Sequence, residues 1–236
     1  MKNDTLSVKV DVAKPAKKMN MKNEFSVEVS PSNMVQVSPH LTLRIALHIL
    51  AKAYDPLKLV LLCKMISSLL LRLTMHVLKK EAHGPVTWDK VVDGDLLRRW
   101  SDYFSMLFYL GDTKFPRSFK PANCNLDIDP DLATFSYGNP DSFGTCAYAD
   151  WALLDESRES TFMMSRAKLS PILQKGKTVP NELSGAVYNC RLKEWIMKHS
   201  GVTFKRHLYF VDSRIVQAMI QKTSYGYSTF AGLRVG

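Results

Sequence analysis

The stretch from Phe135 to Tyr148 constrains the fold of this chain more than any other part of the sequence. It contains two runs rich in β-forming residues, and the breaker Gly-Asn-Pro-Asp separates them. This pattern predicts a β-hairpin with strands at Leu132–Tyr137 and Phe143–Trp151. The C-terminal half of the chain is therefore expected to be built on a sheet.

Three further elements are expected after this hairpin. A third strand is expected at 161–167, and an amphipathic helix at 182–199. The apolar run 208–211 reads as a buried strand that ends at Asp212, and another helix follows it. This order of elements resembles that of a ribonuclease H-like fold, with a mixed sheet and flanking helices.

The N-terminal half has a helical pattern instead. Apolar residues at helical spacing predict helices at 41–54, at 59–80 and from Asp93 to Phe108. Residues 115–130 contain Pro and Asp without periodicity, so we place a domain boundary there. The predicted class is thus α+β or α/β, with a helical region before the sheet.

The expected organisation has three parts: a leader (1–37), a helical region (38–120) and a sheet domain (131–236). Two short alternating runs in the leader, 6–10 and 25–29, suggest a half-buried hairpin. A loosely ordered leader is an equally good interpretation, because neither run is long enough to be stable alone.

Charge is unevenly distributed along the chain. The net charge is +10, and residues 1–120 carry 19 Lys and Arg against 11 Asp and Glu. A basic half suits a polyanionic partner such as nucleic acid, because phosphate contacts release counterions. A merely soluble basic surface is as common, so charge alone does not decide the partner.

The cysteines and the longest apolar run bear on location. The four cysteines are widely spaced and form no C-x-x-C pair: Cys63, Cys124, Cys146 and Cys190. This argues against a zinc site and for a reduced, intracellular protein in the cytoplasm or nucleus. No secretory signal is visible, and Lys64 and Arg72 interrupt the only run long enough to suggest a membrane span.

Glu182 and Asp212 are the candidate site residues, and each also has a purely structural explanation. A Glu in the first turn of a helix is favoured by the helix dipole. An Asp directly before a helix is a common N-cap. Their joint order along the chain favours a functional role, because it resembles the order of the metal-binding acids in ribonuclease H-like enzymes.

Short motifs follow one another along the chain: Tyr54-Asp55-Pro56-Leu57, Trp88-Asp89, Leu96-Leu97-Arg98-Arg99-Trp100, Phe115-Pro116-Arg117, Phe143-Gly144-Thr145-Cys146-Ala147-Tyr148, Ser165-Arg166-Ala167-Lys168-Leu169-Ser170-Pro171, Asn181-Glu182-Leu183-Ser184-Gly185-Ala186 and Val211-Asp212-Ser213. From about Leu41 to Gly236 the chain resembles the polyproteins of BEL/Pao-type retrotransposons, in the segment often labelled Pao retrotransposon peptidase. Lys58 stands where a Gly is usual in that family. No protease motif occurs in the chain.

This resemblance implies a reverse-transcriptase thumb/connection-like region followed by a ribonuclease H-like domain, with residues 1–37 as the tail of the palm. The implied ancestral activity is cleavage of RNA in RNA–DNA hybrids by two Mg²⁺ ions. Glu182 and Asp212 would be the second and third metal-binding acids. An RNA–DNA hybrid or another nucleic acid is the implied partner, with no membrane.

Two departures from the family pattern bear on the metal-binding acids. Tyr137-Gly138-Asn139 stands where the family has an Asp-Gly motif with the first metal-binding acid. A phenol is neutral at pH 7 and cannot offset the charge of a metal pair. Asp141 is a poor substitute because it lies in the turn. The fifth strand and the last helix, which bring the fourth acid, would lie beyond Gly236.

We therefore expect a polyprotein fragment that is catalytically inactive as it stands. Two other interpretations remain open. The chain can be a non-catalytic basic module that binds nucleic acid, or a relic protein without a selected function. The sequence predicts no particular protein partner.

Overall fold

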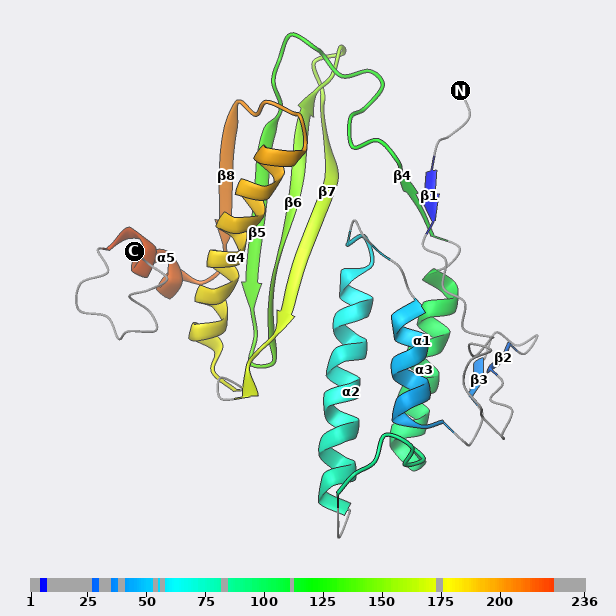
Figure 1. The fold of residues 1–236 in the computed structure, drawn as a ribbon. Helices are drawn as coiled ribbons and strands as arrows, with labels where there is room; N and C mark the ends of the chain where they lie inside the picture. Colours follow the sequence, from blue (N-terminus) through cyan, green and yellow to red (C-terminus); the bar gives the residue numbers. More distant parts are fainter. Residues whose placement is uncertain are drawn as a thin grey trace. The chain divides into compact units, whose positions relative to one another are not determined.

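The computed structural model describes residues 5–7, 27–29, 35–37, 41–52, 55, 58–81, 85–110, 113–172 and 176–222. Contacts between residues divide the chain into two units. Unit 1 comprises Met1–Pro56 and Leu62–Phe115, and unit 2 comprises Leu57–Leu61 and Pro116–Gly236. Figure 1 shows the helices and strands of both units.

Unit 1 is built on three helices: α1 (Leu43–Lys52), α2 (Leu61–Glu81) and α3 (Gly94–Leu110). Their bounds lie within a few residues of the helices predicted from apolar spacing. Trp100 of α3 is fully buried, and its indole Nε1 donates a hydrogen bond to Thr74 Oγ1 of α2 at 3.0 Å. The core around this indole consists of Leu41, Ile45, Ala46, Ile49, Leu70, Val92, Leu96, Trp100, Tyr103, Phe104 and Leu107.

The N-terminal strands do not pair as the alternating pattern suggested. Strand β1 (Thr5–Ser7) pairs with β4 (Lys114–Pro116), and β2 (Val27–Val29) pairs with β3 (Val35–Val37). The expected hairpin between 6–10 and 25–29 is therefore wrong, because each run finds a partner elsewhere. Alternation indicates that a strand has one buried face, but it does not identify the strand beside it.

Unit 2 contains a sheet of four strands and two helices: β5 (Asp131–Gly138), β6 (Ser142–Ala152), β7 (Arg158–Leu169), α4 (Thr178–His199), β8 (Arg206–Val211) and α5 (Arg214–Gln221). The strand order is β7-β6-β5-β8. Strands β5, β6 and β7 are antiparallel neighbours, while β8 runs parallel to β5. A bulge interrupts the β6–β7 register at Ala147/Tyr148.

Helix α4 covers one face of this sheet (Figure 1). Burial alternates along the whole of β6, which is the signature of a strand with one face against a core. Leu192 and Ile196 of α4 pack with Leu132, Ala147 and Met164 from the three antiparallel strands. The helix ends as predicted, with His199 in its last turn and Gly201 beyond it at a φ of 67°.

The start of unit 2 contains an unusual backbone conformation at Lys58, which has a φ of 61°. This is the left-handed region that glycine adopts at little cost. It accounts for the glycine that is usual at this position in the family that the sequence resembles. The Lys58 carbonyl accepts a hydrogen bond from Ser165 Oγ of β7 at 2.8 Å, which holds the segment against the sheet.

The described residues thus form a mixed α+β structure with five helices and a four-strand mixed sheet, consistent with a ribonuclease H-like fold. A further helix expected near Ser228 lies outside the described residues. The division into a leader, a thumb/connection-like region and a sheet domain stays a prediction.

Candidate functional site

The C-terminal end of β5 meets the N-terminal part of α4 at one corner of unit 2. A Cβ atom added at Gly138 would lie 2.3 Å from the backbone nitrogen of Glu182. A Cβ atom at Gly185 would lie 3.0 Å from the carbonyl oxygen of Tyr137. Only residues without a side chain allow this approach, so the end of β5 lies directly on the backbone of α4.

The end of β8 lies beside the same corner. The parallel register pairs Ser136 of β5 with Val211 of β8. Tyr137 and Asp212 are therefore the next residues on two adjacent strands. The structure brings together the backbone positions of Tyr137, Glu182 and Asp212, as the sequence predicted from the order of its elements.

Tyr137 occupies the strand-end position of this corner. Its side chain is 57% exposed, on the face of the sheet opposite α4. A tyrosine at this position supplies a phenol in place of a carboxylate. Position 137 of β5 therefore contributes no carboxylate to the corner.

Glu182 lies in the second turn of α4 and not in its first. The helix begins at Thr178, and its first turn contains no acidic residue. Pro180 stands inside the first turn, where a missing N–H breaks no helical bond, so the helix starts earlier than the sequence suggested. The helix dipole thus does not explain Glu182.

Asp212 is not the N-cap of the helix that follows it. Ser213 is the N-cap of α5, and its hydroxyl accepts a hydrogen bond from the Val216 amide at 3.4 Å. Asp212 is exposed. Among the described residues, the side chains of Glu182 and Asp212 form no hydrogen bond or ion pair. The structural explanations proposed for both acids are therefore wrong.

The turn between β5 and β6 is fixed by several hydrogen bonds. Asn139 Oδ1 accepts from the Asp141 amide at 2.9 Å and from the Ser142 amide at 2.7 Å. Asn181 of α4 donates to the Asn139 carbonyl at 2.7 Å, and the Gly176 amide donates to the Pro140 carbonyl at 2.9 Å. Moving Asp141 into a metal site would break this arrangement.

The donors at this corner do not fit a pair of Mg²⁺ ions. Two dications need several carboxylate oxygens. The corner offers Glu182 and Asp212, and the third position is the Tyr137 phenol. In the part of the chain that the structure describes, no three His, Cys, Asp or Glu side chains could hold a metal ion.

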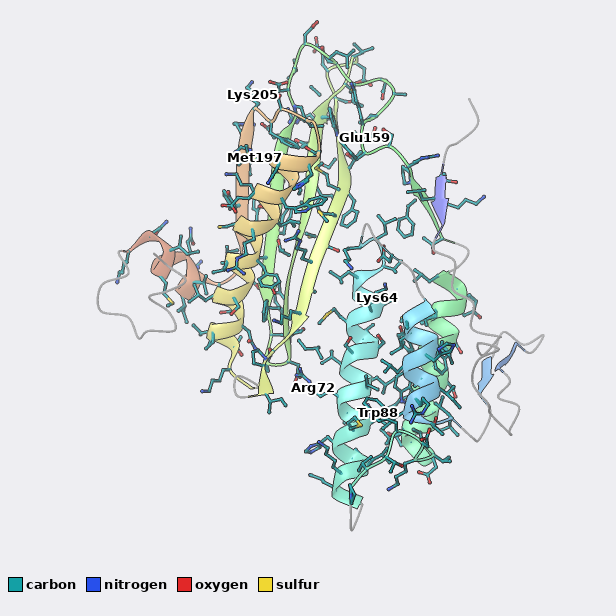
Figure 2. The ribbon with its side chains drawn as sticks, viewed as in Figure 1. Lys64, Arg72, Trp88, Glu159, Met197 and Lys205 are labelled. Atoms are coloured by element: carbon teal, nitrogen blue, oxygen red, sulfur yellow. The ribbon has the colours of Figure 1, made fainter. Side chains whose placement is uncertain are left out.

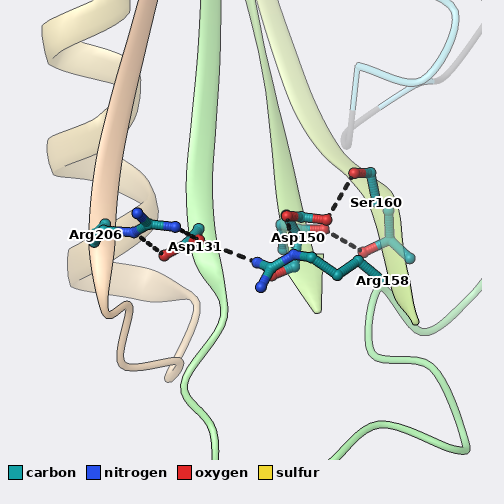
Figure 3. A network of polar contacts seen from close by, with 7 residues as sticks. Asp131, Asp150, Arg158, Ser160 and Arg206 are labelled. Atoms are coloured by element: carbon teal, nitrogen blue, oxygen red, sulfur yellow. Dashed lines mark hydrogen bonds and ion pairs between the residues drawn. The ribbon is translucent and has the colours of Figure 1, made fainter. Parts of the chain in front are cut away.

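Sequence reasoning missed an ionic network at the opposite end of β5 (Figure 3). Asp131 is buried and accepts hydrogen bonds from Arg206 at 3.0 and 2.6 Å and from Arg158 at 3.0 Å. Arg158 also bonds Asp150, which accepts from Ser160. The hydrogen bonds from Arg206, together with the positive charge, lower the pKa of Asp131. No local pattern links residues 75 positions apart, so this network could not be predicted from the sequence.

A second missed feature is a basic-aromatic patch where β7 meets the C-terminal half of α4: Arg166, Arg191, Trp195, Lys198 and His199. The indole of Trp195 is 41% exposed and stacks on the His199 ring, with a centroid distance of 4.7 Å. Arg166 lies over the indole at 5.7 Å. Arg191 and Lys198 lie four residues before and three after Trp195, on the same side of the helix. The spacing of Arg191, Trp195 and Lys198 along the helix is the sequence feature from which this patch could have been predicted.

Figure 2 places this half of α4 in the molecule. The labelled Met197 lies on it, at the end of unit 2 where Lys205 precedes β8. Trp195 is 13 residues beyond Glu182, which corresponds to about 20 Å along the helix. The basic-aromatic patch and the corner are therefore separate places on one element.

The strand order, the crossover through α4 and the corner at the ends of β5 and β8 define a ribonuclease H-like domain. Residues 42–213 match the profile of the Pao retrotransposon-like RNaseH-like domain, and the chain belongs to this family. None of the curated proteins compared matches the chain.

No helix in the described ranges is long and apolar enough to cross a membrane. The longest apolar helix of unit 1, α2, carries Lys64 and Arg72 within its length (Figure 2).

Proposed function

We propose that this chain is a ribonuclease H-like domain that binds nucleic acid without cleaving it. The observation that supports the loss of cleavage is Tyr137 at the corner where β5, α4 and β8 meet. Glu182 and Asp212 remain there, but two carboxylates and a phenol are too few negative ligands for the metal pair that the family's chemistry requires.

Cleavage assays and metal titration test this proposal together. The unaltered chain should leave a labelled RNA–DNA hybrid intact with either Mg²⁺ or Mn²⁺. Tyr137→Asp should bind Mn²⁺ more tightly than the unaltered chain in calorimetric titration, because it adds a third carboxylate to the corner. Phe135→Asp is the matched control, since Phe135 is an exposed aromatic two residues earlier on the same strand face.

Two results would overturn the proposal. One is cleavage by the unaltered chain that Glu182→Gln abolishes. The other is equal Mn²⁺ binding by Tyr137→Asp and Phe135→Asp, which would mean that Tyr137 does not occupy a metal position.

The basic-aromatic patch supports retained binding. It combines an exposed indole with guanidinium and ammonium groups, and proteins that bind nucleic acid use this combination for stacking and phosphate contact. A ribonuclease H-like domain also implies a nucleic-acid partner, and we propose an RNA–DNA hybrid as that partner.

Salt dependence of hybrid binding tests this part. Fluorescence anisotropy should show that log K falls linearly with log salt concentration. Arg191→Ala and Lys198→Ala should each reduce that slope by about 0.9 if the side chain contacts a phosphate. Lys120→Ala, an exposed lysine far from α4 in the sequence, should leave the slope unchanged. Binding that is absent or independent of salt would contradict the proposal.

We also propose an intracellular location, in the cytoplasm or nucleus. All four cysteines are free in the structure, as is usual in reducing compartments. Microscopy of a fluorescently tagged chain should show it inside the cell, and recovery of the chain from the medium would contradict this.

A further inference from the structure

The basic-aromatic patch on α4 contains a preformed stack of planar groups. The His199 ring lies nearly parallel to the Trp195 indole, with an angle of 22° between the rings. Its Nδ1 atom donates a hydrogen bond to the Trp195 carbonyl oxygen at 2.8 Å, and the Arg166 guanidinium lies over the same indole. These contacts hold the indole in one orientation while Trp195 stays 41% exposed. A side chain that is already ordered loses less entropy when a ligand binds to it.

Unpaired bases are the ligands that such planar groups recognise. A base inside a duplex is stacked between its neighbours and must leave the stack before a side chain can reach its face. An unpaired base has a free face, which stacks on aromatic rings or on guanidinium planes. The group formed by Arg166, Trp195 and His199 therefore suits a single strand better than a double helix.

Basic side chains accompany this stack along the helix. Arg191, Trp195 and His199 follow one another at steps of four residues and form a ridge of about 12 Å. Lys198 lies on the same side of the helix. The length of the ridge corresponds to about three or four nucleotides at the 3.4 Å spacing of a stacked strand. The phosphates of a strand whose base stacks on the indole would thus lie within reach of guanidinium and ammonium groups.

The basic side chains of the patch are available to phosphate groups. In the part of the chain that the structure describes, no carboxylate forms an ion pair with Arg166, Arg191 or Lys198. Glu194 directly precedes Trp195 but lies about 100° away around the helix axis. The arginines around the N-terminal end of β5, in contrast, are held by carboxylates. Positive charge beside an exposed planar stack matches the phosphates and the bases of one strand.

We propose that the basic-aromatic patch binds the single-stranded extension of a hybrid, by stacking an unpaired base on Trp195 and its planar neighbours. This inference rests on the nucleic-acid binding proposed above, and it specifies which part of the nucleic acid the patch takes. Stacking tolerates every base, so extensions of different sequence should bind alike.

Three probes test this inference on the full chain, without a divalent metal so that no cleavage can occur. The first is a blunt RNA–DNA hybrid, and the second is the same hybrid with a single-stranded extension of about six nucleotides. Fluorescence anisotropy at one salt concentration should show that the extension tightens binding by about tenfold. The third probe has an abasic extension of equal length, which keeps the phosphates but lacks the bases. It should lose most of this gain.

Variants at position 195 assign the gain to the indole. Trp195→Ala should make the blunt and the extended hybrid bind equally, whereas Trp195→Phe should keep part of the difference because a phenyl ring still offers a face for stacking. Trp88→Ala is the matched control, since Trp88 is 43% exposed and belongs to unit 1. Circular dichroism would establish that the variants are folded, and the ratio of the two affinities does not depend on the folded fraction.

Each of the contrary outcomes has a distinct meaning. Equal binding of the blunt and the extended hybrid by the unaltered chain would overturn this inference and leave the hybrid binding proposed above intact. A gain that the abasic extension retains in full would show that phosphate contact is responsible in place of stacking. A gain that survives in Trp195→Ala would overturn the assignment to this patch. If no probe binds, both proposals fail.

Discussion

At the residue scale, Tyr137 and Gly138 affect the site differently although they are neighbours. The side chain at Tyr137 determines which ligands the corner can offer. Gly138 determines whether β5 can reach α4 at all, since its missing Cβ leaves room for the Glu182 backbone. The fold at this corner therefore depends on the glycine, and the chemistry depends on the residue before it.

Gly138→Ala should destabilise unit 2 by about 1–3 kcal/mol. The added Cβ would meet backbone atoms at 2.3–2.6 Å, and these can move only if α4 shifts. Urea unfolding followed by circular dichroism measures the loss. Gly144→Ala offers a graded comparison, because its Cβ would meet its nearest atom at 3.1 Å and should cause a smaller loss. Equal stability of Gly138→Ala and the unaltered chain would contradict the close approach.

Sequence reasoning located the three corner positions but misjudged the two acids individually. The element order was sufficient to place Tyr137, Glu182 and Asp212 together. The structural explanations for Glu182 and Asp212 failed because a helix start that shifts by one or a few residues changes which residue lies in the first turn or at the N-cap. Pro180 is accepted within the first turn of α4, and Ser213 takes the cap of α5.

At the element scale, the ends of β5 are held in different ways. Its C-terminal end packs against α4 through backbone contact, whereas its N-terminal end is held by the charges of Arg158 and Arg206 around Asp131. The run 208–211 was expected to be a buried strand, but Leu208, Tyr209 and Phe210 of β8 are 37%, 46% and 45% exposed. The positions of the strands along the sequence were predictable from alternation, breakers and this apolar run. Their ionic link was not, because Arg206 is brought to Asp131 by the parallel pairing of β8 with β5.

Asp131→Asn should reduce the free energy of unfolding by about 1–3 kcal/mol near neutral pH. Because the folded-state pKa of Asp131 lies below its unfolded value, its contribution is complete above the unfolded pKa and declines as pH falls through the folded pKa. The difference in the free energy of unfolding between Asp131→Asn and the unaltered chain should therefore shrink below about pH 4.

Urea unfolding at a series of pH values between about 2 and 7 measures this difference. Asp129→Asn is the control, because it removes an exposed carboxylate only two residues earlier in the chain. A difference between Asp131→Asn and the unaltered chain that stays constant down to the lowest pH would contradict the role given to the carboxylate.

At the scale of the whole molecule, the cores of the two units share no residues. The core of unit 1 surrounds Trp100, and the layer between α4 and the sheet of unit 2 surrounds Leu132. The sequence changes from helical to β periodicity between the residues of these two cores. Periodicity does not reveal that the short segment Leu57–Leu61 groups with unit 2 although the rest of α2 belongs to unit 1.

Calorimetry should resolve two unfolding transitions, one for each unit. Trp100→Ala should lower only one of them, by about 3–5 kcal/mol of unit stability, and Leu132→Ala only the other, by about 2–5 kcal/mol. A single transition that both variants shift equally would show one cooperative domain. The absence of any cooperative transition would favour a relic protein over a selected binding module.

The left-handed backbone at Lys58 affects how this chain can be made more stable. A residue with a side chain loses about 1–2 kcal/mol in that conformation, and glycine does not. Part of the stability gained by placing a glycine there is offset because glycine is more flexible in the unfolded chain. Lys58→Gly should therefore raise the stability of unit 2 by up to about 1 kcal/mol, measured as a higher urea midpoint. A positive φ at a residue with a side chain is thus a place where a glycine would favour the folded state. Lower stability in Lys58→Gly would show that the lysine side chain contributes more than its backbone conformation loses.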